Sequence, residues 1–158
     1  MIDKNILIEK ILLLLETNFS ELSKAVIKAL EYAHSDELEQ ESKYDTRKTE
    51  ANYLALAQKV RLEQLKQEIL SIKNLKLTKQ YKHIQIGALF SLKLRHIVKY
   101  YFISPTKGIG KILIDKTEVN ILSINSPISI EAIDLAQGDE FEVELPSGSL
   151  LYEVINIY

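Results

Sequence analysis

The sequence contains no cysteine and no tryptophan, and only 3 of its 158 residues are histidine. The absence of cysteine excludes disulfides, thiolate metal sites and cysteine nucleophiles. Because His34, His83 and His96 are scattered along the chain, we expect no zinc site. A strong excess of one charge is also absent: 27% of the residues are charged, yet the net charge is only −2. The bulk charge therefore gives no indication of nucleic-acid binding.

Long uninterrupted apolar runs are missing as well. The most apolar segment, residues 1–16 (MIDKNILIEKILLLLE), is interrupted by Glu9 and Lys10, and no small-residue cleavage site follows it. A signal peptide or a membrane span needs a longer clean run. We therefore expect a cytoplasmic protein without membrane contact. The length and the apolar content of 46% suffice for one ordinary domain or two small ones.

Glycine and proline are absent from the first half of the chain. All 5 glycines and all 3 prolines lie after residue 86. A stretch without either residue predicts one or two long helices, whereas the turn residues of the second half occur at intervals typical of strands. We place the boundary in the lysine-rich segment 76–82, which gives two domains at residues 1–78 and 79–158.

The first half carries two apolar seams whose members lie alternately three and four residues apart, which is the spacing of a coiled coil. The first seam comprises Ile8, Leu12, Leu15, Phe19, Leu22, Val26, Ala29 and Ala33, and the second comprises Ala51, Ala55, Gln58, Leu62, Leu65, Ile69 and Ile72. When the chain is folded back near Ser42, the facing positions have residue numbers with a constant sum. We infer an antiparallel coiled-coil hairpin with its tip near residues 38–46, an arm of about 45 Å at roughly 1.5 Å per residue.

Carboxylates gather around this expected tip, with an acidic segment at residues 31–41 followed by Asp45 and Glu50. Carboxylate oxygens are suitable ligands for Mg²⁺ and can orient a water molecule for phosphodiester hydrolysis. Simpler interpretations stay open, because Asp45 could cap the second helix and Glu50 could be a solvated helix acid. Tyr53 could pack at the edge of the seam.

The second half is predicted to be a small α+β domain, with one short helix on an antiparallel sheet. Residues 84–124 supply strands rich in β-branched and aromatic residues, and residues 139–158 predict a hairpin. Ser126 as N-cap and Pro127 at the first helical position begin the short helix, and Gly138 is expected to end it.

Charge is divided unevenly along this second half. Residues 81–116 are strongly basic, whereas residues 117–158 are acidic and contain no lysine or arginine. Two interpretations stay open: either facing strands balance one another, or the domain presents a polarised docking surface.

The C-terminal segment 124–157 (INSPISIEAIDLAQGDEFEVELPSGSLLYEVINI) resembles the C-terminal pattern of the bacterial Gre transcript-cleavage factors. The shared features are a Ser-Pro start, a short helix, Gly-Asp, alternating valines, a Pro-x-Gly turn and Tyr-Glu-Val. Residues 50–57 (EANYLALA) resemble a stretch on the second helix of that family. The resemblance implies an N-terminal coiled coil followed by an FKBP-like domain.

The resemblance also implies a function as a transcription elongation factor that binds bacterial RNA polymerase. Such a factor docks at the rim of the secondary channel, inserts its coiled coil and stimulates cleavage of backtracked RNA by the polymerase itself. It is not an enzyme, it has no cofactor of its own, and it contacts the nascent RNA only indirectly. We expect a monomer.

The resemblance assigns roles to individual residues. The tip carboxylates Asp45, Glu50 and Glu41 are the candidate catalytic residues, and Asp45 and Glu41 are candidate ligands of a Mg²⁺ shared with the polymerase. The candidate polymerase contacts are Ser126, Pro127, Tyr53 and Arg47.

The sequence departs from the family pattern where the chemistry would occur. If Tyr53 is matched to the family tyrosine, the two family acids fall on Thr46 and Thr49, and a family glycine becomes Ser129. These departures favour a channel-binding competitor or inhibitor without cleavage activity as a second hypothesis. Two further hypotheses are a non-catalytic coiled-coil adaptor, which would pair between molecules, and a peptidyl-prolyl isomerase.

Overall fold

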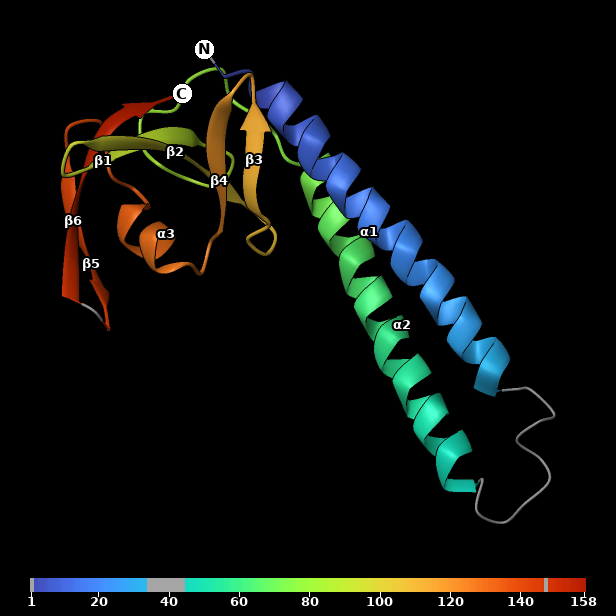
Figure 1. The fold of residues 1–158 in the computed structure, drawn as a ribbon. Coiled ribbons are helices and arrows are strands. Elements are labelled where there is room, and N and C mark those ends of the chain that lie inside the picture. The colour runs from blue at the N-terminus through green and yellow to red at the C-terminus, as the bar shows by residue number, and fades with distance from the viewer. Residues whose placement is uncertain (1, 34–44, 147) are drawn as a thin grey trace. The chain divides into compact units, whose positions relative to one another are not determined.

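The structure is a computed structural model that describes residues 2–33, 45–146 and 148–158 (Figure 1). The side chains of residues 32–33, 45–48 and 51 fall outside this description. Contacts divide the chain into two compact units. One is Leu13–Leu70, and the other combines Met1–Leu12 with Ser71–Tyr158.

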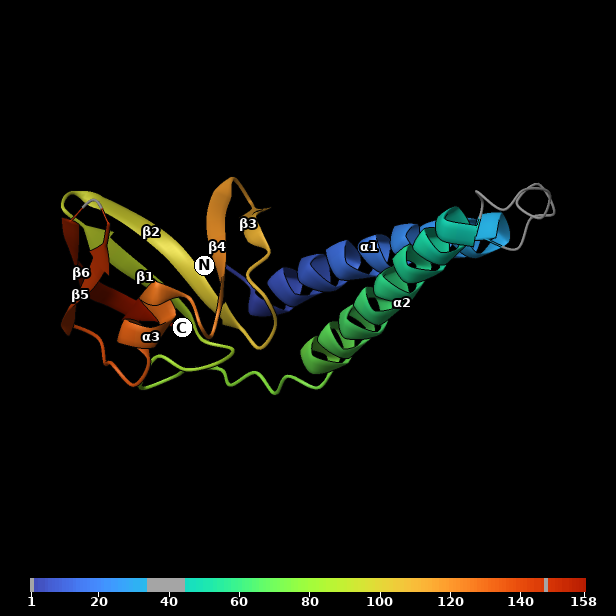
Figure 2. The same ribbon diagram turned by 90° about the horizontal axis from the view of Figure 1, so that it is seen from below.

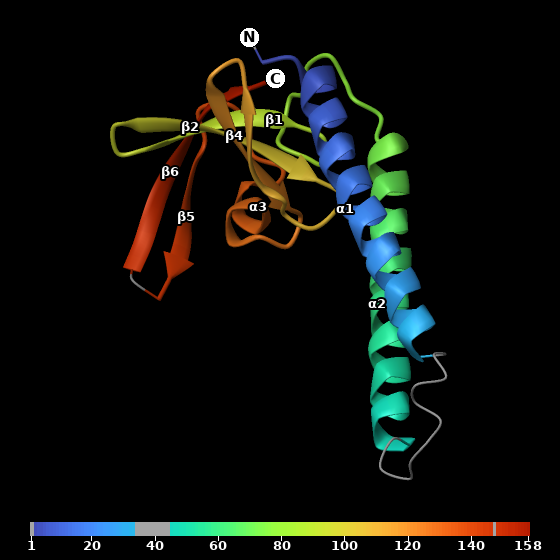
Figure 3. The same ribbon diagram turned by 45° about the vertical axis from the view of Figure 1, so that its right-hand side comes forward.

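Two long helices, α1 (Lys4–Ala33) and α2 (Asp45–Lys73), form the predicted helical hairpin. Within residues 13–70 they lie side by side and run in opposite directions (Figure 3). Neither helix contains glycine or proline, so nothing in their sequence interrupts the hydrogen-bond ladder.

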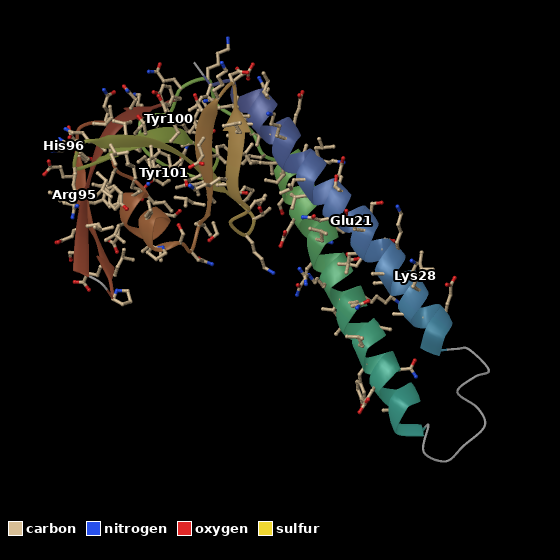
Figure 4. The ribbon with its side chains drawn as sticks, viewed as in Figure 1. Glu21, Lys28, Arg95, His96, Tyr100 and Tyr101 are labelled. Carbon is tan, nitrogen blue, oxygen red and sulfur yellow. The ribbon has the colours of Figure 1, made fainter. Side chains whose placement is uncertain are left out.

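Burial along the two helices follows the predicted seams. Leu15, Val26, Ala55 and Ile69 are buried, and the intermediate class contains Phe19, Leu22, Ala29, Gln58, Leu62 and Leu65. Outer positions such as Glu21 and Lys28 are exposed (Figure 4). The heptad prediction is therefore confirmed for the described side chains of residues 13–70. At the start of α1 the fully buried residues are Leu7 and Ile11, which lie outside the predicted seam.

The second unit contains a six-stranded sheet with one short helix. The elements are β1 (Leu89–Leu94), β2 (Ile97–Ser104), β3 (Gly110–Ile114), β4 (Thr117–Ser123), α3 (Pro127–Ala132), β5 (Glu140–Leu145) and β6 (Gly148–Ile157). The spatial order of the strands is β3-β4-β2-β1-β6-β5.

The sheet is mixed, since β2 and β4 pair in parallel while the other neighbours are antiparallel. This differs from the wholly antiparallel sheet expected from the sequence. The reason is the hairpin of β3 and β4: β3 lies at the sheet edge, and the turn at Asp115–Lys116 returns the chain between β3 and β2. A strand that returns in this way runs in the direction of β2.

The main core lies between the sheet and α3, which lies on one face of the sheet (Figure 2). Alternate residues of each strand point to this face, as the pleat requires. The core includes Phe90, Leu92, Tyr101, Phe141, Val143, Tyr152, Val154 and, from α3, Ala132. Two ring pairs stack within it, Phe90 with Tyr101 at 5.8 Å and Phe141 with Tyr152 at 5.4 Å between centroids.

Helix α3 begins as predicted, with Ser126 as N-cap and Pro127 in the first turn. It ends earlier than predicted, at Ala132, with Ile133 as the C-cap. The expectation that Gly138 ends the helix is wrong. Gly138 instead adopts φ 92° before β5, where its N–H donates to the carbonyl of Val154 at 2.8 Å.

Among the described residues, no helix has the length and apolar character needed to cross a membrane.

Candidate functional site

The arm residues Glu50 and Tyr53 lie on α2, three positions apart, so they are neighbours on the helix surface. Both side chains are exposed, and Tyr53 is 69% exposed. The interpretation in which Tyr53 packs at the edge of the seam is therefore wrong. An exposed aromatic side chain next to a carboxylate is available for contact with another molecule.

Asp45 is the first residue of α2, and Arg47 lies in the first turn of that helix. The side chains of both residues, and the whole of Glu41, lie outside the described part of the chain. The metal and catalytic roles of Asp45 and Glu41, and the contact role of Arg47, stay predictions.

The outer side of α2 carries an apolar stripe that sequence reasoning missed. Tyr53, Leu56 and Val60 are spaced by three and four residues, so they share one face, and each is more than half exposed. The buried Ala55 marks the opposite, seam-facing side of the helix. The signal was present in the sequence as a second apolar periodicity beside the seam. Exposed apolar patches of this kind are typical of interaction surfaces.

The Ser126–Pro127 segment is a tightly bonded cap in the second unit. The Ser126 hydroxyl accepts a hydrogen bond from the Ser129 N–H at 3.2 Å and donates to Ser129 Oγ at 2.8 Å. Ser129 is fully buried and stands where the Gre resemblance would place a glycine. Its hydroxyl adds a second hydrogen bond to the cap, which a glycine could not form. Two apolar side chains on either side of the cap, Ile124 and Ile130, are 37% and 59% exposed. The cap thus lies in a partly apolar surface.

The basic and acidic segments of the second unit pair with each other across the sheet. Lys93 on β1 bonds to Glu153 on β6 at 2.8 Å, and Lys111 on β3 bonds to Glu118 on β4 at 2.6 Å. The hydrogen bond to Glu153 and its negative charge raise the pKa of Lys93. These pairs support the interpretation in which facing strands balance one another. Arg95, at the exposed turn between β1 and β2, lies outside both pairs (Figure 4).

The comparisons with known proteins give structural matches without a sequence match. No protein-family model and no curated protein matches the chain. Solved structures of Gre-type factors are similar to it. Gfh1 (GreA factor homolog 1) of Thermus thermophilus is 15% identical, covers 96% of this chain and 92% of its own, and has a TM-score of 0.37.

Two further solved structures give similar values. Gfh1 of Thermus aquaticus is 16% identical over 96% of this chain and 91% of its own, with a TM-score of 0.39. The transcription elongation factor GreA/GreB from Nitrosomonas europaea is 14% identical over 59% of this chain and 78% of its own, with a TM-score of 0.37.

Proposed function

We propose that this chain is a transcription factor of the Gre type, which binds bacterial RNA polymerase and inserts its helical hairpin into the secondary channel. The observation that carries the proposal is the pattern of burial in residues 13–70. Among the described side chains of this range, the fully buried ones all belong to the seam between α1 and α2, and most of the others are exposed. A slim two-helix arm of this kind is suited to enter a narrow channel. The resemblance of residues 124–157 to the Gre pattern supports the same function.

In this proposal the two units have different tasks. The surface around the α3 cap, with Ser126, Pro127, Ile124 and Ile130, docks on the rim of the channel. Its exposed isoleucines supply apolar area, and its cap fixes the backbone, so that docking costs little conformational entropy. The outer stripe of Tyr53, Leu56 and Val60 contacts the channel wall.

The tip carboxylates would act at the active site of the polymerase. The polymerase's Mg²⁺ would supply Lewis-acid stabilisation of the phosphoryl oxygens and would activate water. Asp45 and Glu41 would each offer carboxylate oxygens to that ion, and Glu50 would orient water by accepting a hydrogen bond from it. The described residues contain no group of three or more His, Cys, Asp or Glu side chains that could hold a metal. We propose that the ion belongs to the polymerase and that this chain adds ligands to it.

A second candidate function is competition for the channel without cleavage. It is favoured by the departures from the family pattern, in which Thr46 and Thr49 occupy the positions of the two family acids. A threonine hydroxyl carries no charge and is a weaker ligand for Mg²⁺ than a carboxylate.

The test is RNA cleavage in stalled, backtracked complexes of bacterial RNA polymerase with Mg²⁺. The variants are Asp45→Ala, Glu41→Ala and Glu50→Ala, and the control is Glu21→Ala, which removes an exposed acid from the middle of α1. Cleavage that is lost in a tip variant but kept in Glu21→Ala supports the cleavage factor. Inhibition of a standard Gre factor without cleavage supports the competitor. Absence of cleavage, of competition and of polymerase binding contradicts both.

A further inference from the structure

The second unit contains a pocket on the face of the sheet opposite α3, with a volume of about 200 Å³. Leu89 and Ile114 lie behind its floor, and at 0% and 1% exposed they leave almost no surface of their own open to a bound group. Ile2 also borders the pocket. Drug-sized and cofactor pockets measure roughly 300–1,000 Å³. This smaller volume suits a group of the size of one side chain.

Two tyrosines form the walls of the pocket. The rings of Tyr100 on β2 and Tyr158 after β6 have centroids 6.3 Å apart and planes tilted by 37°. Tyr100 and Tyr101 are successive strand residues and point to opposite faces (Figure 4). Tyr101 therefore belongs to the core on the α3 side, whereas Tyr100 is left for the pocket.

A carboxylate lies at the rim, supplied by the turn between β3 and β4. Asp115 and Lys116 form this turn with φ 45° and 68°, and Asp115 and Thr117 both line the pocket. Left-handed conformations are unfavourable for residues other than glycine, asparagine and aspartate. An aspartate tolerates the positive φ at this position and also places a negative charge beside the rings.

The charge of Asp115 is not neutralised within the described part of the chain, where it forms no ion pair. Nearby lysines have other partners: Lys111 bonds to Glu118 at 2.6 Å, and Lys10 Nζ donates to the carbonyl of Leu113 at 2.7 Å. Lys116, next to Asp115 in the turn, is exposed and does not line the pocket. Among the described residues that line the pocket, Asp115 is the one with a charged side chain.

The same unit already holds one ammonium group through a cation–π contact and hydrogen bonds to carbonyl oxygens. The ammonium of Lys4 lies 4.8 Å from the ring centroid of Tyr81 and donates to the carbonyls of Thr78 and Lys79 at 2.6 and 3.2 Å. A tyrosine face together with oxygen acceptors thus holds an ammonium elsewhere in this unit. The pocket offers two tyrosine rings and a full carboxylate, without an occupant from the described part of the chain.

We propose that the pocket of Tyr100, Tyr158 and Asp115 binds a guanidinium or ammonium group on a short aliphatic stem. The cation lies against the tyrosine rings, and Asp115 neutralises it. The source is either a basic side chain of a partner protein or a free alkyl cation. This site is independent of the proposed polymerase function, because neither the arm nor the α3 cap takes part in it.

The test is titration of the full chain with n-butylguanidinium, followed by NMR of the tyrosine ring signals. The neutral isostere n-butylurea is the control probe, because it keeps the stem and shape and removes the charge. The variants are Asp115→Asn and Tyr100→Leu. The control variant is Asp134→Asn, which changes another aspartate with positive φ (67°) that does not line the pocket. Asparagine tolerates positive φ, so both Asn variants keep their turns.

We expect n-butylguanidinium to shift the Tyr100 and Tyr158 signals with a Kd on the order of millimolar. Asp115→Asn should weaken binding about fivefold, Asp134→Asn should leave it unchanged, and n-butylurea should bind at least about fivefold more weakly. Equal binding of the urea, or equal effects of the two Asn variants, overturns the proposal. So does the absence of any shift at Tyr100 and Tyr158.

A second arm of the experiment separates the two sources, with acetyl-Gly-Arg-Gly-amide as the probe. Binding as tight as that of n-butylguanidinium, with the same loss in Asp115→Asn, supports a basic side chain of a partner. Binding of n-butylguanidinium alone supports a free alkyl cation, because the peptide backbone is then excluded from the rim. If neither probe binds, the cation site does not exist, and this result leaves the polymerase proposal untouched.

Discussion

Ser126 and Ser129 are joined by two hydrogen bonds: the Ser129 N–H donates to Ser126 Oγ at 3.2 Å, and Ser126 Oγ–H donates to Ser129 Oγ at 2.8 Å. Because Ser129 is fully buried, loss of the Ser126 hydroxyl leaves a buried N–H without that partner. We expect Ser126→Ala to lower the free energy of unfolding by about 1 kcal/mol. Urea denaturation measures this change in the free energy of unfolding, and Ser149→Ala at an exposed position is the control. Equal stability of the two variants contradicts the capping role.

Gln58 is the polar residue of the seam, and its Oε1 is buried without a hydrogen-bond partner among the described residues. The seam prediction places it opposite Val26. Because a buried unsatisfied acceptor is costly, we expect Gln58→Leu to raise the free energy of unfolding by about 1 kcal/mol. Gln64→Leu, at an exposed position of the same helix, should change it by less than about 0.5 kcal/mol. A loss of stability in Gln58→Leu would show that Gln58 has a partner in solution.

Two buried serines in the sheet have opposite hydrogen-bonding states. Ser91 Oγ has no partner among the described residues, whereas Ser104 Oγ lies 2.7 Å from Thr106 Oγ1 and accepts from the Thr106 N–H at 3.2 Å. We expect Ser91→Ala to leave stability equal or higher and Ser104→Ala to lower it by about 1 kcal/mol. Thermal unfolding shows which of the two variants is more stable. A Ser104→Ala variant more stable than Ser91→Ala would contradict these hydrogen-bond assignments.

Stability should fall at high pH because of Tyr101. Burial, with a smaller effect of Tyr152, raises the pKa of Tyr101 to about 12. Between pH 10 and 12 the unfolded chain loses this proton while the folded chain keeps it, so the free energy of unfolding decreases as the pH rises. The slope should stay below the roughly 1.4 kcal/mol per pH unit of one fully retained proton, since solvent still screens part of the ring.

Tyr101→Phe tests this directly, because it removes the titrating hydroxyl and keeps the ring stacked on Phe90. Its denaturation midpoint should fall less steeply than that of the unaltered chain between pH 10 and 12. Burial also raises the pKa of Tyr152, so a residual decline is expected in the variant. Parallel profiles for the two proteins would contradict the assignment to Tyr101.

The outer stripe of α2 should matter for binding and not for folding. Leu56 and Val60 are 59% and 54% exposed, so Leu56→Ser and Val60→Ser should change the free energy of unfolding by less than about 0.5 kcal/mol. If the arm enters the polymerase channel as proposed, the double variant should bind polymerase about tenfold more weakly. Leu62→Ser, in the seam, should instead destabilise the hairpin. Unchanged polymerase affinity in the double variant would show that the stripe is not part of the interface.

Local patterns predicted the helical hairpin, the seam and the start of α3, because each depends on residues close together in the sequence. The spacing of Leu15, Val26 and Ile69 indicates a buried face, and Ser126-Pro127 is a local helix-start signal. The parallel pairing of β2 with β4 was not predictable in this way, since strand pairing depends on contacts between distant segments. The same holds for the pocket, where Tyr100, Asp115 and Tyr158 meet only in the folded chain.

The most direct test of the central claim is binding of the full chain to purified bacterial RNA polymerase, measured alone and in competition with a standard Gre factor. We expect saturable binding that the standard factor displaces, because in the proposed function both proteins would occupy the secondary channel. The Leu56→Ser and Val60→Ser double variant should bind more weakly while remaining folded. Absence of binding, or binding that a saturating amount of the standard factor leaves unchanged, would contradict the account.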